Sequence, residues 1–216
     1  MKLVAYCFFI IMLLTSCGGK DVETEPSDKG YDYFPLVEGL YREYQVVDER
    51  FQVGTIDTSI YFLREELQET VDASDEMQQL VRRYKRTDTL SDWKFDSTWI
   101  QAKNEINAFY LENSVRFNKL EFPLFTNKKW DMNAYNTQSD LQSEVRFVGG
   151  KYNGFEEVTY IAIDSFFNLV GREHMYEVYK KNVGLVEKHN ESLNHQPKAD
   201  TVGFRIHQKL IKYGQK

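Results

Sequence analysis

The apolar residues of this chain recur at the spacing of β-strands rather than that of helices. Between Trp93 and Trp99, large aromatic residues alternate with charged or small polar ones, which is the period-two pattern of a half-buried strand. No long run carries a convincing helical stripe, although residues 65–80 leave room for one helical turn near residues 74–76. Because parallel strands need long, usually helical crossovers, the pattern predicts an antiparallel sheet.

About eleven segments have the length and composition of strands. They are residues 40–47, 58–63, 80–86, 93–99, 106–111, 115–122, 144–148, 158–163, 174–181, 185–189 and 202–211. Short polar or glycine-containing links separate them, as in a meander. We therefore expect one all-β domain over residues 31–216, with about ten or eleven antiparallel strands in a curved sheet or open barrel. Gly149-Gly150 followed by Asn153-Gly154 marks the clearest turn, where we expect the sheet to divide into two halves.

The first residues contain the parts of an export signal in the required order. Met1 and Lys2 give a positive start, residues 3–14 form an apolar run too short to span a membrane, and small residues precede Cys17. This arrangement resembles the lipobox of bacterial lipoproteins, in which signal peptidase II cuts before the cysteine. The resemblance implies a signal peptide over residues 1–16 and a Cys17 that carries a diacylglycerol thioether and further acyl chains such as palmitate, enough to anchor the protein to a membrane. The alternative is an ordinary signal peptide with a chance cysteine.

The residues after the cysteine predict a tether and a location. Residues 18–30 are rich in glycine and charge and offer one buried-type residue, Val22, so residues 17–30 are interpreted as the lipidated cysteine with a flexible linker. Gly18 stands where an Asp would resemble an inner-membrane retention signal, so we expect the outer membrane, with its periplasmic and surface faces both open. An excess of 33 acidic over 27 basic residues argues against a nucleic-acid partner.

Three segments of the body resemble a group of uncharacterised lipoproteins of Bacteroidota type. The segment 33–44 resembles their YFPLxxGxxWxY opening, with Tyr41 in place of the usual Trp. Residues 122–124 with 129–130 resemble their middle, and 179–186 resemble their VGLV strand, with Asn182 in place of a more usual Gly. The resemblance implies an all-β lipoprotein domain and carries no catalytic residues.

Local motifs for catalysis or metal binding are absent from the sequence. Cys7 leaves with the signal and Cys17 is blocked by lipid, so the mature domain has no thiol nucleophile and no disulfide. No nucleophile elbow occurs. The four histidines, His174, His189, His195 and His207, lack metal-binding spacing. We expect no metal and no cofactor; the alternative is a zinc site that adds Glu187 or Glu191 to His189 and His195.

Several charged residues are interpreted as surface groups. The carboxylate pairs Glu65-Glu66 and Glu156-Glu157 point to opposite faces of a strand, so neither pair can flank one bond. The one basic cluster comprises Arg82, Arg83, Lys85 and Arg86, with Tyr84 between them. Its face is expected to be a solvated strand, and the alternative is a site for a phosphate or carboxylate.

The row Trp93, Phe95 and Trp99 is the candidate ligand face, because alternation places the three rings on one side of a strand. Such a row can stack on sugar rings or line an acyl-chain cavity, whereas the simpler interpretation is core packing.

Three hypotheses for function follow. The first is a lipid-anchored envelope lipoprotein that acts as a non-enzymatic binding or structural module, with the membrane and an unknown envelope protein or lipid as partners. The second is a lipid or lipoprotein carrier, similar to periplasmic carriers of the Lol type, which predicts a large apolar cavity lined by residues such as Trp93, Trp99 and Phe109. The third is a hydrolase, which predicts a pocket that joins a histidine to two carboxylates.

Overall fold

The computed structural model describes residues 28–73, 75–195 and 201–216. The predicted signal peptide, Cys17 and most of the predicted tether lie outside the described residues. A short 3₁₀ turn, η1 (Tyr31–Tyr33), precedes the strands. These are β1 (Leu40–Gln52), β2 (Thr55–Ala73), β3 (Glu76–Arg86), β4 (Lys94–Lys103), β5 (Asn107–Glu112), β6 (Val115–Glu121), β7 (Lys129–Asp131), β8 (Gln142–Tyr152), β9 (Phe155–Phe167), β10 (Gly171–Lys180), β11 (Gly184–His195) and β12 (Thr201–Gln215).

All of these strands belong to one sheet in the order β6-β5-β4-β3-β2-β1-β12-β11-β10-β9-β8-β7. Every neighbouring pair is antiparallel, and only the pairing of β1 with β12 joins strands distant in sequence. The expected all-β antiparallel meander is thus confirmed.

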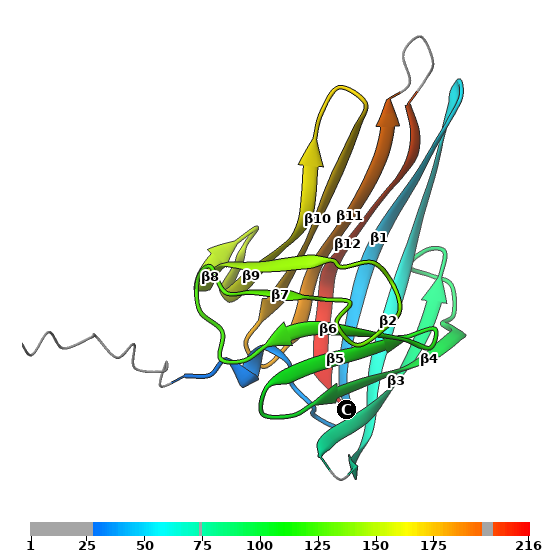
Figure 1. Cartoon of the computed structure of the whole chain (residues 1–216). Coiled ribbons are helices and arrows are strands. Elements are labelled where there is room, and N and C mark those ends of the chain that lie inside the picture. Colours follow the sequence, from blue (N-terminus) through cyan, green and yellow to red (C-terminus); the bar gives the residue numbers. More distant parts are fainter. Residues whose placement is uncertain (1–27, 74, 196–200) are drawn as a thin grey trace, which may run out of the picture.

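The two ends of the sheet meet, so it curls into a nearly closed barrel (Figure 1). Strand β6 is followed directly by β7, which lies at the opposite end of the strand order. The backbone N–H of Asn118 in β6 donates to the carbonyl of Met132 just after β7, at 2.8 Å. The indole N–H of Trp130 in β7 donates to the carbonyl of Asn118, also at 2.8 Å. These bonds use backbone groups that an open edge would leave unpaired.

The inner face of the curled sheet holds the main core. Its buried side chains come from alternate positions of strands around the barrel and include Leu67, Val81, Tyr110, Leu120, Val145 and Ile161. A second buried cluster includes Tyr176 and Val178 of β10, which alternate with the inward residues Glu177 and Tyr179. Tyr152, at the tip of the hairpin between β8 and β9, lies 6.1 Å from Tyr176 between ring centroids, on the face opposite Glu177. The hairpin between β8 and β9 therefore covers part of the outer face.

Two turn predictions are corrected. The expected room for a helical turn within residues 65–80 is taken up by strands in the described residues, because β2 runs to Ala73 and β3 starts at Glu76; residue 74 lies outside the described residues. Gly149 and Gly150 lie inside β8, where the pairing with β9 shifts register, so they bend a strand and do not divide the sheet. The turn itself uses Asn153 and Gly154, both at positive φ, which suits a two-residue hairpin.

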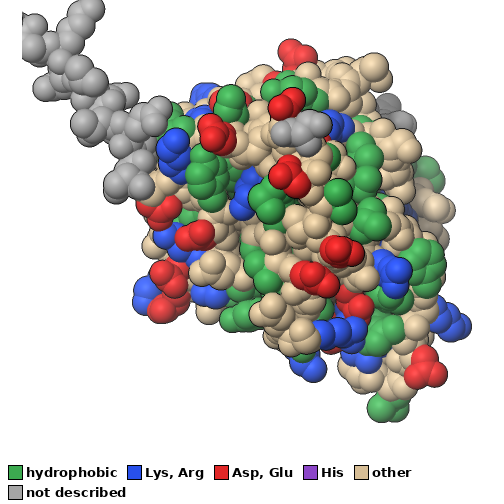
Figure 2. Space-filling view, turned by 90° about the horizontal axis from the view of Figure 1, so that it is seen from below, with side chains coloured by type: hydrophobic (Ala, Val, Ile, Leu, Met, Phe, Trp, Pro, Cys, Tyr) green, Lys and Arg blue, Asp and Glu red, His purple; other side chains and the backbone are tan. Residues whose placement is uncertain are grey.

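The three-residue strand β7 was not expected, because its only large apolar residue is Trp130. In the described part of the chain, no helix has the length and hydropathy needed to span a bilayer. Seen from below in Figure 2, the molecule shows acidic, basic and hydrophobic side chains interspersed, without a broad area of one charge.

Candidate functional site

The inside of the barrel contains paired charges. Arg42 of β1, which is 2% exposed, lies 3.2 Å from Glu65 of β2. Arg83 of β3 approaches the same carboxylate at 3.5 Å. The hydroxyls of Tyr44 and Tyr110 each lie 3.4 Å from a Glu65 oxygen and donate to it. Burial alone would lower the pKa of the Arg42 guanidinium. Tyr44, Tyr110 and Glu65 outweigh this effect and raise that pKa.

A second charged group lies beside the first. Lys119 of β6 bridges Glu112 at 3.1 Å and Glu177 at 2.9 Å, and Lys188 of β11 lies 3.9 and 3.7 Å from the same two carboxylates. The hydroxyl of Tyr179 donates to Glu177 at 2.5 Å. Burial alone would raise the pKa of Glu112, but Lys119 and Lys188 overcome it and hold that pKa at about 2.

The two charged groups enclose a cavity of about 40 Å³, which Trp99 also lines. That volume holds a water molecule or two, whereas pockets for organic ligands span roughly 300–1,000 Å³. Phe109, expected beside Trp99 in a carrier, instead lies under the guanidinium of Arg116, 3.8 Å from the ring centroid. The interior around Trp99 is filled by paired charges and aromatic rings.

The interpretation of Glu65 as a surface charge is wrong, because this residue is 3% exposed. Its expected opposition to Glu66 is confirmed, since Glu66 pairs with Arg64 at 2.8 Å on the other face. Alternation showed that the two residues face opposite ways. It contained no signal for which face lies inside.

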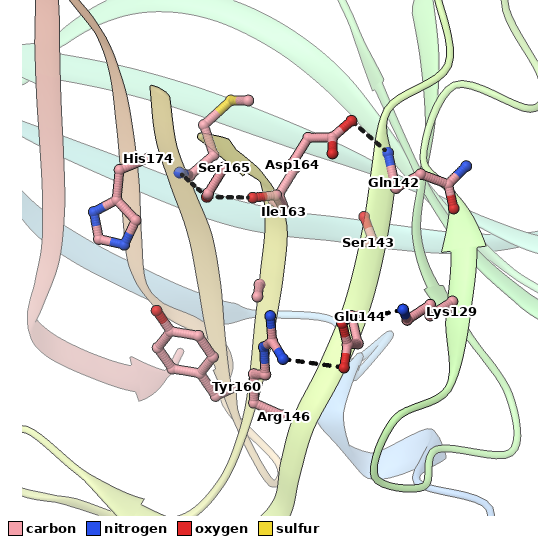
Figure 3. A pocket seen from close by; sticks show the side chains of 12 residues that line it. Lys129, Gln142, Ser143, Glu144, Arg146, Tyr160, Ile163, Asp164, Ser165 and His174 are labelled. Carbon is pink, nitrogen blue, oxygen red and sulfur yellow. Dashed lines mark hydrogen bonds and ion pairs between the residues drawn. The ribbon is translucent and has the colours of Figure 1, made fainter. Parts of the chain in front are cut away.

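An open groove of about 610 Å³ lies over strands β7 to β10 (Figure 3). Its lining comprises Lys129, Gln142, Ser143, Glu144, Arg146, Tyr160, Ala162, Ile163, Asp164, Ser165, His174 and Met175. On β9, Ala162 pairs with Glu144 of β8 and Tyr176 of β10. A methyl side chain surrounded by large residues leaves space above the sheet, so Ala162 forms the floor of the groove.

One side of the groove is polar. Glu144 lies 3.6 Å from Lys129 and 3.1 Å from Arg146, so both cations form ion pairs with one carboxylate. Asp164 accepts the backbone N–H of Gln142 at 3.3 Å. The side-chain amide of Gln142, which is exposed, makes no hydrogen bond within the described residues.

The opposite side is aromatic, with Tyr160 and His174 facing Gln142 and Lys129 across the hollow (Figure 3). Tyr160 stacks on Tyr176 at 5.1 Å, and Tyr176 stacks on His189 at 5.3 Å, so the wall continues across β9, β10 and β11. Burial, with Tyr152 and Glu187 adding to it, raises the pKa of Tyr160 to about 12. The Tyr160 hydroxyl therefore keeps its proton at neutral pH and can donate a hydrogen bond.

A buried carboxylate, that of Glu187, contacts this aromatic wall through Tyr176. Glu187 accepts hydrogen bonds from Tyr176 at 2.8 Å and from the amide of Asn153 at 3.2 Å, and His207 lies 3.1 Å away. Burial lowers the pKa of the neighbouring His189 to about 4, and the other histidines add to this effect. The ring of His189 is thus neutral at physiological pH and serves as part of the aromatic wall.

The groove meets the criterion set for a hydrolase, because it brings His174 together with Glu144 and Asp164. Among the described residues, however, His174 makes no hydrogen bond to either carboxylate or to a serine. The Ser165 hydroxyl donates to the carbonyl of Ile163 at 2.7 Å, and Ser143 is fully buried. The groove thus lacks the hydrogen-bonded nucleophile and base of a catalytic dyad.

The candidate ligand face does not form, because a bulge interrupts β4. Arg83 pairs with Ser97 but Tyr84 pairs with Phe95, which shifts the alternation by one residue. Trp99 faces inward, with the Arg83 guanidinium 3.4 Å from its ring centroid. Phe95 is 63% exposed and contacts Tyr84 on the outer face. The prediction that Trp93, Phe95 and Trp99 share one face is wrong for this reason.

The basic cluster is also distributed over two faces. Arg83 points inward to Glu65, whereas the guanidinium of Arg86 lies 4.2 Å from the ring centroid of Trp93. The alternative zinc site is not assembled either. His189 stacks on Tyr176 and His195 contacts Thr201 at 3.0 Å, and the described residues contain no group of three metal-ligating side chains.

The geometry defines a single-domain, all-β protein whose interior contains buried ion pairs beside a hydrophobic core and whose outer face carries an open polar and aromatic groove. No protein-family model and no curated protein matches the chain. Its structure is similar to that of a protein considered to be exported, with a YmcC-like fold, from Bacteroides fragilis, at 11% identity and a TM-score of 0.47, over 84% of this chain and 98% of that one. It is also similar to that of a protein considered to be a lipoprotein from Parabacteroides distasonis, at 12% identity and a TM-score of 0.46, with the same coverage. Likenesses of this extent leave the activity open.

Proposed function

We propose that this protein is a lipid-anchored protein of the bacterial outer membrane whose β domain is a non-enzymatic binding module, and that the β7–β10 groove is its binding site. The anchor rests on the parts of an export signal, which occur in the required order over residues 1–16 directly before Cys17. The groove is the observation that supports binding outside the barrel. It offers about 610 Å³, against about 40 Å³ in the cavity beside Trp99.

The carrier hypothesis requires space for acyl chains. The cavity beside Trp99 is lined by buried cations and carboxylates, which lose their paired geometry if an acyl chain enters. An external groove requires no such rearrangement, because its side chains are already in contact with water. For this reason we place binding outside the barrel.

Photo-cross-linking in intact cells tests the groove as a binding site. In the test variant, a photoreactive amino acid replaces Gln142 on the groove wall. In the control variant, the same amino acid replaces Leu90, which is 95% exposed in the β3–β4 loop. We expect a defined adduct from position 142 that is absent from position 90. The adduct is also expected to disappear when Ala162→Trp fills the groove floor. Equal adducts from both positions, or an adduct that survives Ala162→Trp, would refute the proposal.

A hydrolase is the second candidate, supported by the meeting of His174 with Glu144 and Asp164 in one groove. It predicts that His174→Ala abolishes turnover of the ligand captured by cross-linking while the variant still binds it. The non-enzymatic proposal predicts that wild-type protein leaves this ligand chemically unchanged. Mass spectrometry of the ligand after incubation with wild type and variant separates the two.

A further inference from the structure

We infer that the β7–β10 groove binds a neutral carbohydrate, one or two sugar rings in size. This inference rests on the proposed function, because it names the ligand class of the same site. It combines three properties of the groove: balanced charge, hydrogen-bonding groups without partners, and an aromatic side opposite a polar one.

The charge of the groove favours a neutral ligand. The groove is lined by two cations, Lys129 and Arg146, and by two carboxylates, Glu144 and Asp164, so these charges balance. Both cations pair with Glu144, at 3.6 and 3.1 Å, so an anionic ligand would have to displace a carboxylate already in place. A cationic ligand would meet the two cations themselves. A neutral polar molecule avoids both costs.

Hydrogen-bonding groups without partners occur on both sides of the groove. The Gln142 side-chain amide and the Tyr160 hydroxyl make no hydrogen bond within the described residues, and both residues line the groove (Figure 3). An amide offers two donors and one acceptor, and a phenol offers one of each. Carboxylate oxygens of Glu144 and Asp164 add further acceptors. Adjacent hydroxyl groups on a sugar ring each donate and accept, so they complement this mixed set.

The aromatic side and the floor complete the match. The rings of Tyr160 and His174 form one wall (Figure 3). The methyl group of Ala162, between Glu144 of β8 and Tyr176 of β10, forms the floor. A sugar ring has an apolar C–H face and a rim of hydroxyls, whereas a lipid chain lacks the hydroxyls. Amphipathic aromatic residues suit ligands of this kind because one end is apolar and the other polar. The wall is rigid, since Tyr160 stacks on Tyr176 at 5.1 Å.

Saturation-transfer NMR on the full chain in detergent micelles tests the inference. The probes are neutral disaccharides of glucose, galactose, mannose and N-acetylglucosamine, each compared with a sulfated counterpart. We expect transfer to the ring protons of at least one neutral probe, with its sulfated form at least tenfold weaker. Ala162→Trp is expected to reduce the affinity at least tenfold by filling the floor, and Gln142→Ala to reduce it several-fold. Gln45→Ala, which removes an exposed glutamine on β1, is the matched control and should bind as wild type does.

Each failure has its own meaning. No transfer to any neutral probe, or equal affinity in Ala162→Trp and wild type, overturns the carbohydrate inference. Equal or tighter binding of the sulfated probes overturns the charge argument and with it the inference. If Ala162→Trp unfolds the protein, the exposed Gln142→Ala variant decides, and unchanged affinity in that variant refutes the site.

The outcomes also separate this inference from the proposed function. A cross-linked ligand at position 142 without sugar binding leaves the proposed function standing and removes only its ligand class. Cleavage of a bound disaccharide preserves the ligand class and refutes the non-enzymatic part of the proposed function.

Discussion

Replacement of Lys119 by methionine tests the charged interior directly. The Lys119 side chain is 6% exposed and holds Glu112 at 3.1 Å and Glu177 at 2.9 Å. Without it, two buried carboxylates remain, and Lys188 lies farther from them, at 3.9 and 3.7 Å. Removal of one partner from a buried ion pair costs about 3–5 kcal/mol, because the remaining charge loses its compensation. We expect Lys119→Met to lower the free energy of unfolding by that amount at pH 7.

The same variant should reverse the pH dependence of stability. In the wild type, Lys119 and Lys188 overcome the effect of burial and hold the pKa of Glu112 at about 2, against an ordinary value of 4.5. A depressed pKa stabilises the fold above pH 4.5, and this contribution, about 3 kcal/mol, is lost as the pH falls toward 2. In Lys119→Met, burial raises the pKa of both carboxylates, so acidification from pH 7 to pH 4 should stabilise the variant relative to wild type.

Urea unfolding followed by tryptophan fluorescence at pH 7 and pH 4 measures both effects. The matched control is Lys151→Met, because the Lys151 side chain is 79% exposed and its pair with Glu156 is worth at most about 1 kcal/mol. A loss below about 1 kcal/mol for Lys119→Met at pH 7 would refute the electrostatic reasoning. So would an equal loss at pH 7 and pH 4.

Three further outcomes are expected. Gly184→Ala should destabilise the fold by about 2 kcal/mol more than Gly154→Ala in thermal unfolding: both glycines have positive φ, but only at Gly184 does an added Cβ collide with the guanidinium of Arg42. Cys17→Ala should move the protein from the membrane to the soluble fraction of cells; continued membrane fractionation would contradict lipid anchoring. Leu169→Ser should change the free energy of unfolding by less than about 0.5 kcal/mol in urea titration, because the side chain is 97% exposed; a larger loss would show that the β9–β10 loop packs against another part of the fold.

The sequence predicted the class of fold because strand period and turn chemistry are local properties. The turn at Asn153 and Gly154 needed only positive φ at two adjacent residues. Strand β7 was not predicted because its three residues are too few to show an alternation of apolar and polar side chains. The candidate ligand face failed at a bulge, where one unpaired residue in β4 turned Trp99 inward and left Phe95 outside. A bulge of this kind depends on the partner strand, which a period within one segment does not reveal.

The sequence by itself determined an antiparallel all-β domain and predicted a lipid anchor at Cys17, since both follow from the order of residues along short stretches. Only the tertiary structure decided which face of each strand lies inside. Glu65 is buried because the sheet curls with this face inside, and pairing with β1 and β3 places Arg42 and Arg83 directly opposite it. The groove likewise exists only where β7 to β10 lie side by side around Ala162. A charge far from its partner in sequence is stable inside a protein only after folding supplies that partner, so its location is a property of the fold.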